Sequence, residues 1–285
     1  MGTTSENNRG LRTWEMMHLA MGVGLDDGAS TGDPNTGEVC CRVIAYAGDD
    51  AGNSNAQDSE VKSVNVMLPQ AEEEEPLKNF FLVGDATAAG WNPNNNNTPL
   101  FRSGTDSNLY HYTGYFGAGE FKILETTDWQ PQWGLDNGTL TNSDILGGDP
   151  ASFPVSAAGF YTFTMNIDEM SYSFETYDAS GAATYDIIGL VGAGTSVGWP
   201  SDDNPEPDIV MTQSSIDEHI WFAQGVELTE GGMKFRANLK WDVNWGGGEN
   251  FPSGIANGDD IIAQEGTYNV WFNDITGRYI FIPVE

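Results

Sequence analysis

The chain is built from short stretches in which apolar and polar residues alternate, separated by turns rich in Gly, Asn, Asp and Thr. Alternation with a period of two residues is typical of strands that bury one face. Gly is abundant, with 35 in the chain, and it marks turns between these stretches. The pattern therefore favours an all-β chain over a helical one.

The pattern is weakest near the N-terminus. Residues 11–25 mix apolar residues with Gly and predict a helical turn at most. Residues 38–48 and 61–68 then alternate clearly and predict two strands. Because two strands are too few for a complete sandwich, we interpret residues 1–70 as a partial immunoglobulin-like N-terminal domain. Residues 71–76 include adjacent Glu residues, which repel one another and extend the chain, so they predict an acidic linker.

The rest of the chain carries one pattern twice. In the first copy Lys122 is followed seven residues later by Trp129, and after four more residues by Trp133. The chain has only 11 Lys and Arg residues and 9 Trp residues, so a chance recurrence of this spacing is improbable. The second copy has the same spacing in Lys234, Trp241 and Trp245.

The flanking stretches recur in the same order. Residues 190–199 share Leu, Val, Gly, Thr, Gly and Trp with residues 82–91. Each copy begins with an apolar strand, continues with two middle strands and closes with a hairpin. Such an ordered repeat predicts tandem immunoglobulin-like β-sandwich modules at residues 77–179 and 180–285. The clearest predicted strands are 79–84, 109–116, 120–124, 160–166 and 171–177 in the first module, and 220–222 and 233–237 in the second.

The charge balance excludes several partners. The formal net charge is −31, from 42 Asp and Glu against 11 Lys and Arg. Repulsion from phosphates argues against nucleic acid, and anionic membrane surfaces and acidic polysaccharides are disfavoured for the same reason. The acidity is explained by solubility or by a salt-rich habitat. No apolar run approaches the ~20 residues that span a bilayer, and no secretion signal opens the chain, so we expect one to have been removed or to lie upstream.

Metal and redox chemistry have little support. Cys40 and Cys41 are adjacent, and neighbours on a strand point to opposite faces, so we expect free buried thiols and no bond between them. The three histidines lack the spacing of metal ligands. Asp202–Asn204 and Asp259–Asp260 offer oxygen ligands for Ca²⁺, but a solvated acidic loop is the favoured interpretation. We therefore expect no cofactor.

Trp and Lys at the repeated spacing predict a sugar-binding surface. An indole offers a flat apolar platform to the C–H face of a sugar ring, and a cationic side chain donates hydrogen bonds to its hydroxyls. The alternative is that one Trp of each pair fills the core. Trp91 and Trp199 each follow a Gly directly after a core strand, and we expect both to pack under the sheet. The predicted glycan-binding residues are Lys122, Trp129 and Trp133 in the first module, and Lys234, Arg236, Trp241 and Trp245 in the second.

Taken together, these motifs resemble a known family. The opening Leu-Val-Gly-x5-Gly-Trp, the central Lys-x6-Trp-x3-Trp-Gly and the closing Gly-x-Tyr are similar to the modules of SusE/SusF-type surface glycan-binding, or starch-binding, lipoproteins of the bacterial outer membrane. The resemblance covers residues 77–285, and weakly residues 11–69. It implies an immunoglobulin-like N-terminal domain, noncatalytic binding of a starch-like or other polysaccharide, and a glycan importer complex in the outer membrane as partner. The family's lipid-bearing cysteine has no counterpart here, and the binding residues vary between members, so the glycan does not carry over.

Two other functions are alternatives to glycan binding. A glycoside hydrolase needs two carboxylates at a defined separation, and 42 acidic residues make candidate pairs uninformative. Nucleophile-elbow, zinc-protease and phosphate-loop motifs are absent from the sequence, so we expect no enzyme. A structural protein remains the main alternative, because an incomplete N-terminal domain could assemble filaments or oligomers by strand addition.

Overall fold

The computed structural model describes residues 36–41, 44–45, 57–67, 77–247 and 251–284. Strands dominate this part of the chain, and its helix α2 (Ser143–Leu146) has only four residues. The chain divides into two compact units, Met1–Pro76 and Leu77–Glu285. The prediction of an all-β fold made of sandwiches is confirmed.

In the first unit the described residues form two antiparallel pairs. These are β1 (Thr36–Cys41) with β4 (Lys62–Met67), and β2 (Ile44–Ala45) with β3 (Gln57–Asp58). The two strands predicted near residues 38–48 and 61–68 are therefore present in their described parts. The helical turn predicted at residues 11–25 and the linker predicted at residues 71–76 lie outside the described residues.

The first module consists of two facing sheets. Strands β10-β9-β8-β11 form one sheet in that order, with β5 also paired to β8, and β13-β12-β7-β6 form the other. Phe121 of the first sheet packs against Phe163 of the second, with ring centroids 5.5 Å apart. The strands are β5 (Phe81–Val83), β6 (Phe101–Arg102), β7 (Leu109–Phe116), β8 (Gly119–Leu124), β9 (Gln132–Asp136), β10 (Thr139–Asn142), β11 (Phe153–Val155), β12 (Gly159–Asn166) and β13 (Ser171–Thr176).

The second module repeats this arrangement. Strands β15-β14-β18-β19 form one sheet, with β21 also paired to β18, and β16-β17-β22-β23-β20 form the other. Phe235 of the first sheet stacks on Phe272 of the second at 4.3 Å. The strands are β14 (Ile188–Gly192), β15 (Ile209–Val210), β16 (Thr212–Gln213), β17 (Ile220–Leu228), β18 (Gly231–Ala237), β19 (Asn244–Trp245), β20 (Ser253–Ile255), β21 (Ile261–Ala263), β22 (Gly266–Asn273) and β23 (Arg278–Pro283).

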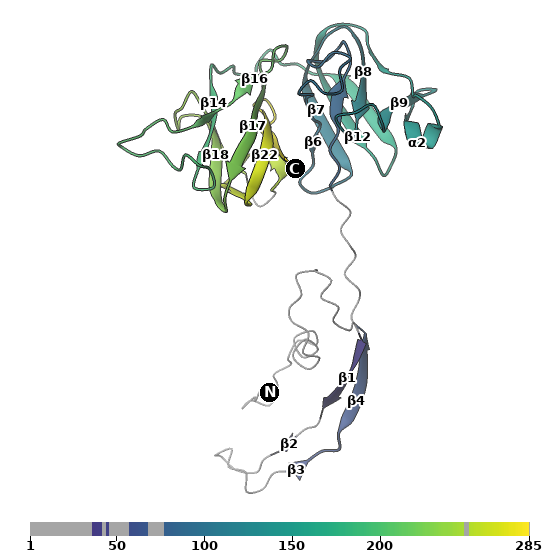
Figure 1. Cartoon of the computed structure of the whole chain (residues 1–285), viewed down its shortest axis with the longest axis vertical. Helices are drawn as coiled ribbons and strands as arrows, with labels where there is room; N and C mark the ends of the chain where they lie inside the picture. Colours follow the sequence, from purple (N-terminus) through teal and green to yellow (C-terminus); the bar gives the residue numbers. More distant parts are fainter. Residues whose placement is uncertain (1–35, 42–43, 46–56, 68–76, 248–250, 285) are drawn as a thin grey trace. The chain divides into compact units, whose positions relative to one another are not determined.

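The two modules pack through one sheet of each, β13-β12-β7-β6 and β16-β17-β22-β23-β20, which we call the inner sheets. The result is a stack of four layers. Figure 1 shows β14 and β18 on one side, then β17 and β22, then β6, β7 and β12, and finally β8 and β9 on the far side. Strands β20 and β23 of the second module contact β6 of the first. The sheets that carry β8 and β18 are therefore the outermost layers, and we call them the outer sheets.

Alternation along the inner strands explains this packing. Ile220, Trp271 and Ile280 belong to the hydrophobic cluster of the first module. Their immediate neighbours Trp221, Phe272 and Phe281 instead belong to the cluster of the second module. Because successive side chains of a strand point to opposite faces, β17, β22 and β23 bury apolar residues on both faces. One face closes the second sandwich and the other joins it to the first module.

Two buried polar side chains hold the interface in register. The Asn273 amide is fully buried and donates to the backbone carbonyl of Thr113 at 2.6 Å. Asp217, only 2% exposed, accepts hydrogen bonds from the Tyr112 hydroxyl at 3.2 Å and the Tyr115 N–H at 2.7 Å. Buried polar groups are costly unless they are paired, so these bonds specify one relative position of the two modules.

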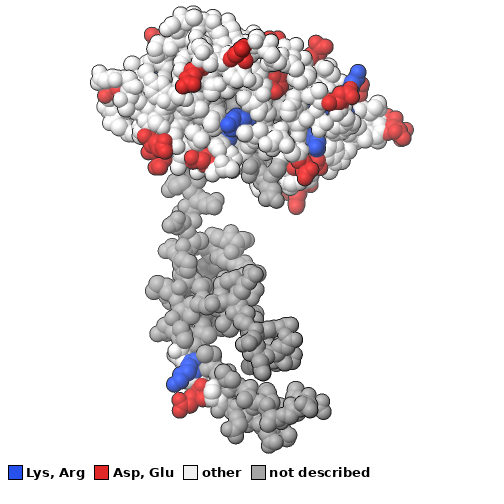
Figure 2. Space-filling model, turned by 180° about the vertical axis from the view of Figure 1, so that it is seen from behind, with Lys and Arg blue, Asp and Glu red and all other residues white. Residues whose placement is uncertain are grey.

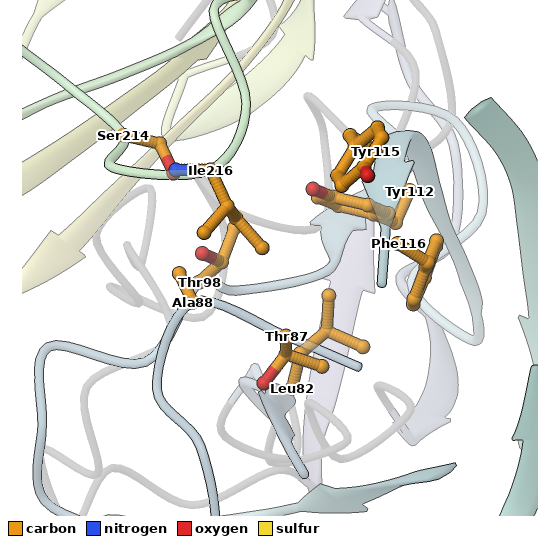
Figure 3. A pocket seen from close by; sticks show the side chains of 9 residues that line it. All are labelled: Leu82, Thr87, Ala88, Thr98, Tyr112, Tyr115, Phe116, Ser214 and Ile216. Atoms are coloured by element: carbon orange, nitrogen blue, oxygen red, sulfur yellow. The ribbon is translucent and has the colours of Figure 1, made fainter. Parts of the chain in front are cut away.

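The loop that carries Asp217 also covers part of the first module. Figure 3 shows Ser214 and Ile216 of this loop facing Ala88 and Thr98 of the first module, near the ring of Tyr112. Burial and the neighbouring Asp217 raise the pKa of Tyr112 well above its ordinary value, so its hydroxyl stays a donor. The second module thus completes the packing around β7.

A matched pair of asparagines tests the polar contact between the modules. Asn166 and Asn273 end equivalent strands, and each side-chain carbonyl accepts two backbone N–H groups of the following turn. Only Asn273 also donates across to Thr113. We expect Asn273→Ala to lower the free energy of unfolding by about 1–3 kcal/mol more than Asn166→Ala, measured by urea denaturation. Equal losses would show that the bond between the modules contributes nothing.

His111 reports on the same interface through its ionisation. Burial lowers the pKa of this β7 side chain from 6.5 to about 4, and the positive charge of Arg278, in the second module, adds to the effect. The unfolded chain binds a proton at His111 more tightly than the folded chain does. The contribution of neutral His111 to the free energy of unfolding is therefore complete above pH 6.5 and is lost as the pH falls to about 4. We expect the stability difference between wild type and His111→Gln to change by about 1.4 kcal/mol per pH unit in this window. An NMR titration that gave His111 an ordinary pKa would contradict the buried interface.

Candidate functional site

Two tryptophans of the first module lie close together at the surface. Trp91 is 44% exposed, and its ring centroid lies 6.4 Å from that of the partly exposed Trp129. The two indole planes differ by 24°, so they present neighbouring apolar faces. We call this pair the first platform.

The second module has the equivalent pair. Trp199 is 38% exposed and Trp241 is 44% exposed, and their ring centroids lie 6.0 Å apart. The angle between the planes is 41°, so this pair is more open than the first. We call it the second platform. The same arrangement at the same place in two modules indicates a site rather than two accidental exposures.

A glycine–threonine turn places the first Trp of each platform. The turn is Gly-x2-Thr-x2-Gly-Trp, at residues 84–91 and 192–199. In the first copy the Gly84 N–H donates to the Gly90 carbonyl at 2.8 Å, and the Thr87 hydroxyl donates to the Gly84 carbonyl. Gly84 has φ +139°, and a Cβ there would lie 2.2 Å from the Glu120 carbonyl oxygen, so only Gly fits. The second copy has the same bonds, and its first glycine is similarly constrained.

Short loops place the second Trp of each platform. Trp129 lies between β8 and β9, in a loop closed by a hydrogen bond from the Glu125 N–H to the Pro131 carbonyl at 3.2 Å. Trp241 lies in the corresponding loop between β18 and β19, where the Asn244 amide donates to its carbonyl at 2.9 Å. Both loops join strands of the outer sheets. Each platform is thus built entirely on its own outer sheet.

A lysine on the middle strand accompanies each platform. Lys122 pairs in register with Val83, next to the glycine turn, and Lys234 pairs in the same way with Val191. The Lys122 ammonium donates to the Gln132 side-chain oxygen at 2.6 Å, and burial lowers its pKa. Since both flanking residues of each lysine are buried in the core, both ammonium groups lie on the outer face of the sheet. The Lys234 ammonium lies 3.5 Å from the Gly258 carbonyl oxygen and 3.9 Å from Asp260. Both ammonium groups therefore have protein partners, and each carries three N–H donors.

Trp133 is not part of a surface site, contrary to the prediction. It lies in β9 with 3% exposure, and its ring meets Phe80 edge-on at 5.7 Å. Its indole N–H donates to the Glu125 carboxylate at 2.8 Å. In β9 the Trp133 side chain is directed into the sandwich core. Trp133 is therefore the core-filling member of its sequence pair.

Arg236 is corrected in the same way, whereas Trp245 stays a prediction. Trp245 lies in β19, is partly buried, and packs edge-on against Phe272 at 5.1 Å, beside the core of the second module. Arg236 is 1% exposed and forms a buried ion pair with Asp208. Its guanidinium carbon lies 4.9 Å from the Trp241 ring centroid, so it supports that indole by a cation–π contact. The Arg236 guanidinium is therefore not placed to reach a ligand directly.

The exposed Trp91 and Trp199 are the residues that the sequence interpretation missed. Both were expected to pack under the sheet because each follows a core strand and a glycine. The structure instead places the glycine in a turn that carries the chain back out of the core, since Gly90 has φ +59° and open space around it. The signal that was available is the repeat itself, because Trp91 and Trp199 recur together with the Gly and Thr that build the turn.

The described residues contain neither a cluster of metal ligands nor a membrane-spanning helix. Within them, no group of three or more His, Cys, Asp or Glu side chains is arranged to hold a metal ion. The expectation of no cofactor, with Ca²⁺ at Asp202–Asn204 or Asp259–Asp260 as the less favoured alternative, stays a prediction. No helix in the same ranges is long and apolar enough to cross a membrane.

A match to a protein family supports the resemblance. Residues 79–174 match the family described as SusF/SusE starch specific CBMs. The crystal structure of SusF from Bacteroides thetaiotaomicron matches with a TM-score of 0.29 and 14% sequence identity, covering 88% of this chain. The aligned part spans 58% of that SusF chain. No curated protein sequence matches. The family match confirms the resemblance to SusE/SusF-type proteins over the first module.

The contrast between Trp129 and Trp133 gives a direct test of the site. Trp133→Ala removes a buried indole and should lower the free energy of unfolding by about 3–5 kcal/mol. Trp129→Ala removes a surface ring and should change it by less than about 0.5 kcal/mol. Thermal or urea unfolding of the two single variants measures both. A stability loss for Trp129→Ala as large as that for Trp133→Ala would place Trp129 in the core.

Proposed function

We propose that this protein binds a starch-like polysaccharide at the cell surface without cleaving it, through the two tryptophan platforms. One observation carries the proposal: each module exposes a pair of neighbouring indoles at the same place. Exposed apolar rings on a soluble surface indicate a ligand when they recur in a built arrangement. The description of the matching family as starch specific supports a glucan as that ligand.

The platform geometry suits successive sugar rings. Each indole offers an apolar face to the C–H groups of one ring, and the neighbouring indole offers a second face at an angle. The angles of 24° and 41° between the planes suit a chain that bends from one ring to the next. Lys122 and Lys234 then supply donors for sugar hydroxyls on the same outer sheets. We expect each site to be weak, because a shallow surface buries little area and the hydroxyls must give up water.

The charge pattern fits a neutral ligand. Figure 2 shows acidic side chains scattered over one face of the molecule, with few basic ones among them. The net charge of −31 repels polyanions but leaves a neutral glucan unaffected. The family resemblance supports a place in an outer-membrane glycan uptake system, with an importer complex as partner and a lipid anchor. The alternative of assembly by strand addition has no support among the described residues.

Affinity electrophoresis tests the proposed function. We expect native gels that contain starch to retard the wild-type protein more than gels without polysaccharide. Trp91→Ala/Trp129→Ala and Trp199→Ala/Trp241→Ala should each weaken binding by about tenfold at the altered platform, or about 1.4 kcal/mol. The variant that combines all four changes should migrate as in the gel without starch.

Controls identify the ligand and exclude general effects of removing an aromatic ring. Tyr177 is also exposed but lies outside both platforms, so Tyr177→Ala should leave the retardation unchanged. Parallel gels with dextran, laminarin, xylan and mannan identify the glycan class. Normal retardation of the four-fold variant would refute binding at the platforms.

A further inference from the structure

The two platforms stand on opposite outer sheets of the four-layer stack. The first is built from the turn after β5 and the loop between β8 and β9. The second is built from the turn after β14 and the loop between β18 and β19. Two inner sheets lie between these outer sheets, as Figure 1 shows. No strand of either inner sheet contributes a ring to a platform.

This arrangement sets a minimum separation between the sites. Facing sheets pack about 10 Å apart, so three successive spacings put the outer sheets ~30 Å apart. The platforms, as loops of those sheets, are separated by the whole thickness of two sandwiches. A short oligosaccharide that covers one pair of indoles therefore does not reach the other pair.

The separation is also held constant. The inner sheets share a hydrophobic contact formed by Ile220, Trp271 and Ile280 against the first module. The buried bonds of Asn273 to Thr113 and of Asp217 to Tyr112 and Tyr115 fix its register. Modules joined by a flexible linker could swing their sites onto one stretch of polymer, but modules joined by a packed interface cannot.

We propose that residues 77–285 act as a rigid cross-linker, whose two platforms bind separate segments of polysaccharide. This inference rests on the proposed function and adds what the two sites do together. Tethered sites raise affinity for one segment only when the geometry lets both engage it. Here the geometry favours two segments, either from two molecules or from distant parts of one branched molecule. The protein would gather glucan chains into a network at the surface that carries it.

Cross-linking is tested by turbidity with a branched glucan. The full chain is mixed with soluble amylopectin over a range of ratios and light scattering is recorded. We expect a maximum at an intermediate ratio that disappears on addition of excess maltoheptaose. Trp91→Ala/Trp129→Ala and Trp199→Ala/Trp241→Ala, which each keep one platform, should give no turbidity singly or mixed together.

Calorimetry with maltoheptaose separates this inference from the proposed function. Two bound oligosaccharides per wild-type chain, and one per single-platform variant, would establish both sites. If both sites bind but wild type gives no turbidity, cross-linking is refuted and glycan binding stands. A single maltoheptaose bound per wild-type chain, about a hundredfold more tightly than by either single-platform variant, would show that both platforms bind one segment and would also refute cross-linking. If maltoheptaose does not bind at all, the proposed function itself fails.

Discussion

The burial of both faces of the inner strands is the constraint on which residues 77–285 depend. Strands β17, β22 and β23 send alternate side chains into two different hydrophobic clusters. A sheet that is apolar on both faces must be covered on both, so the second module is stable only against the first. The buried Asn273 and Asp217 bonds then select one register from the arrangements that apolar contact alone would allow.

The same constraint leaves the outer sheets free for function. Because the inner sheets are used for packing, the exposed loops that can recognise a ligand lie on the outermost layers. Each platform combines one Trp after a tight glycine–threonine turn with one Trp from a short loop. Rigid strands hold the loops, so the rings are presented in place before a ligand arrives, which reduces the entropy lost on binding.

Differences between the two platforms follow from what lies beneath them. In the second module Arg236 takes the place of a buried Leu124 and reaches under Trp241, held by its ion pair with Asp208. The first platform has no such cation in the corresponding position. The planes in the second platform are also more open, at 41° against 24°. The two sites are therefore related in design but not equivalent in detail.

The sequence by itself determined the all-β class, the repeat and most strands, because period-two alternation and recurring spacings are local properties of the chain. The strand predicted at residues 109–116 coincides with β7. Tertiary structure alone decided which tryptophan of each copy is more exposed. Trp129 and Trp133 are close in sequence, but Trp129 lies in the loop before β9, whereas Trp133 lies in β9 with its side chain in the core. Tertiary structure also decided that Trp91 lies beside Trp129, and that the two modules pack through their inner sheets. Those outcomes depend on which distant segments meet, and local pattern does not contain that information.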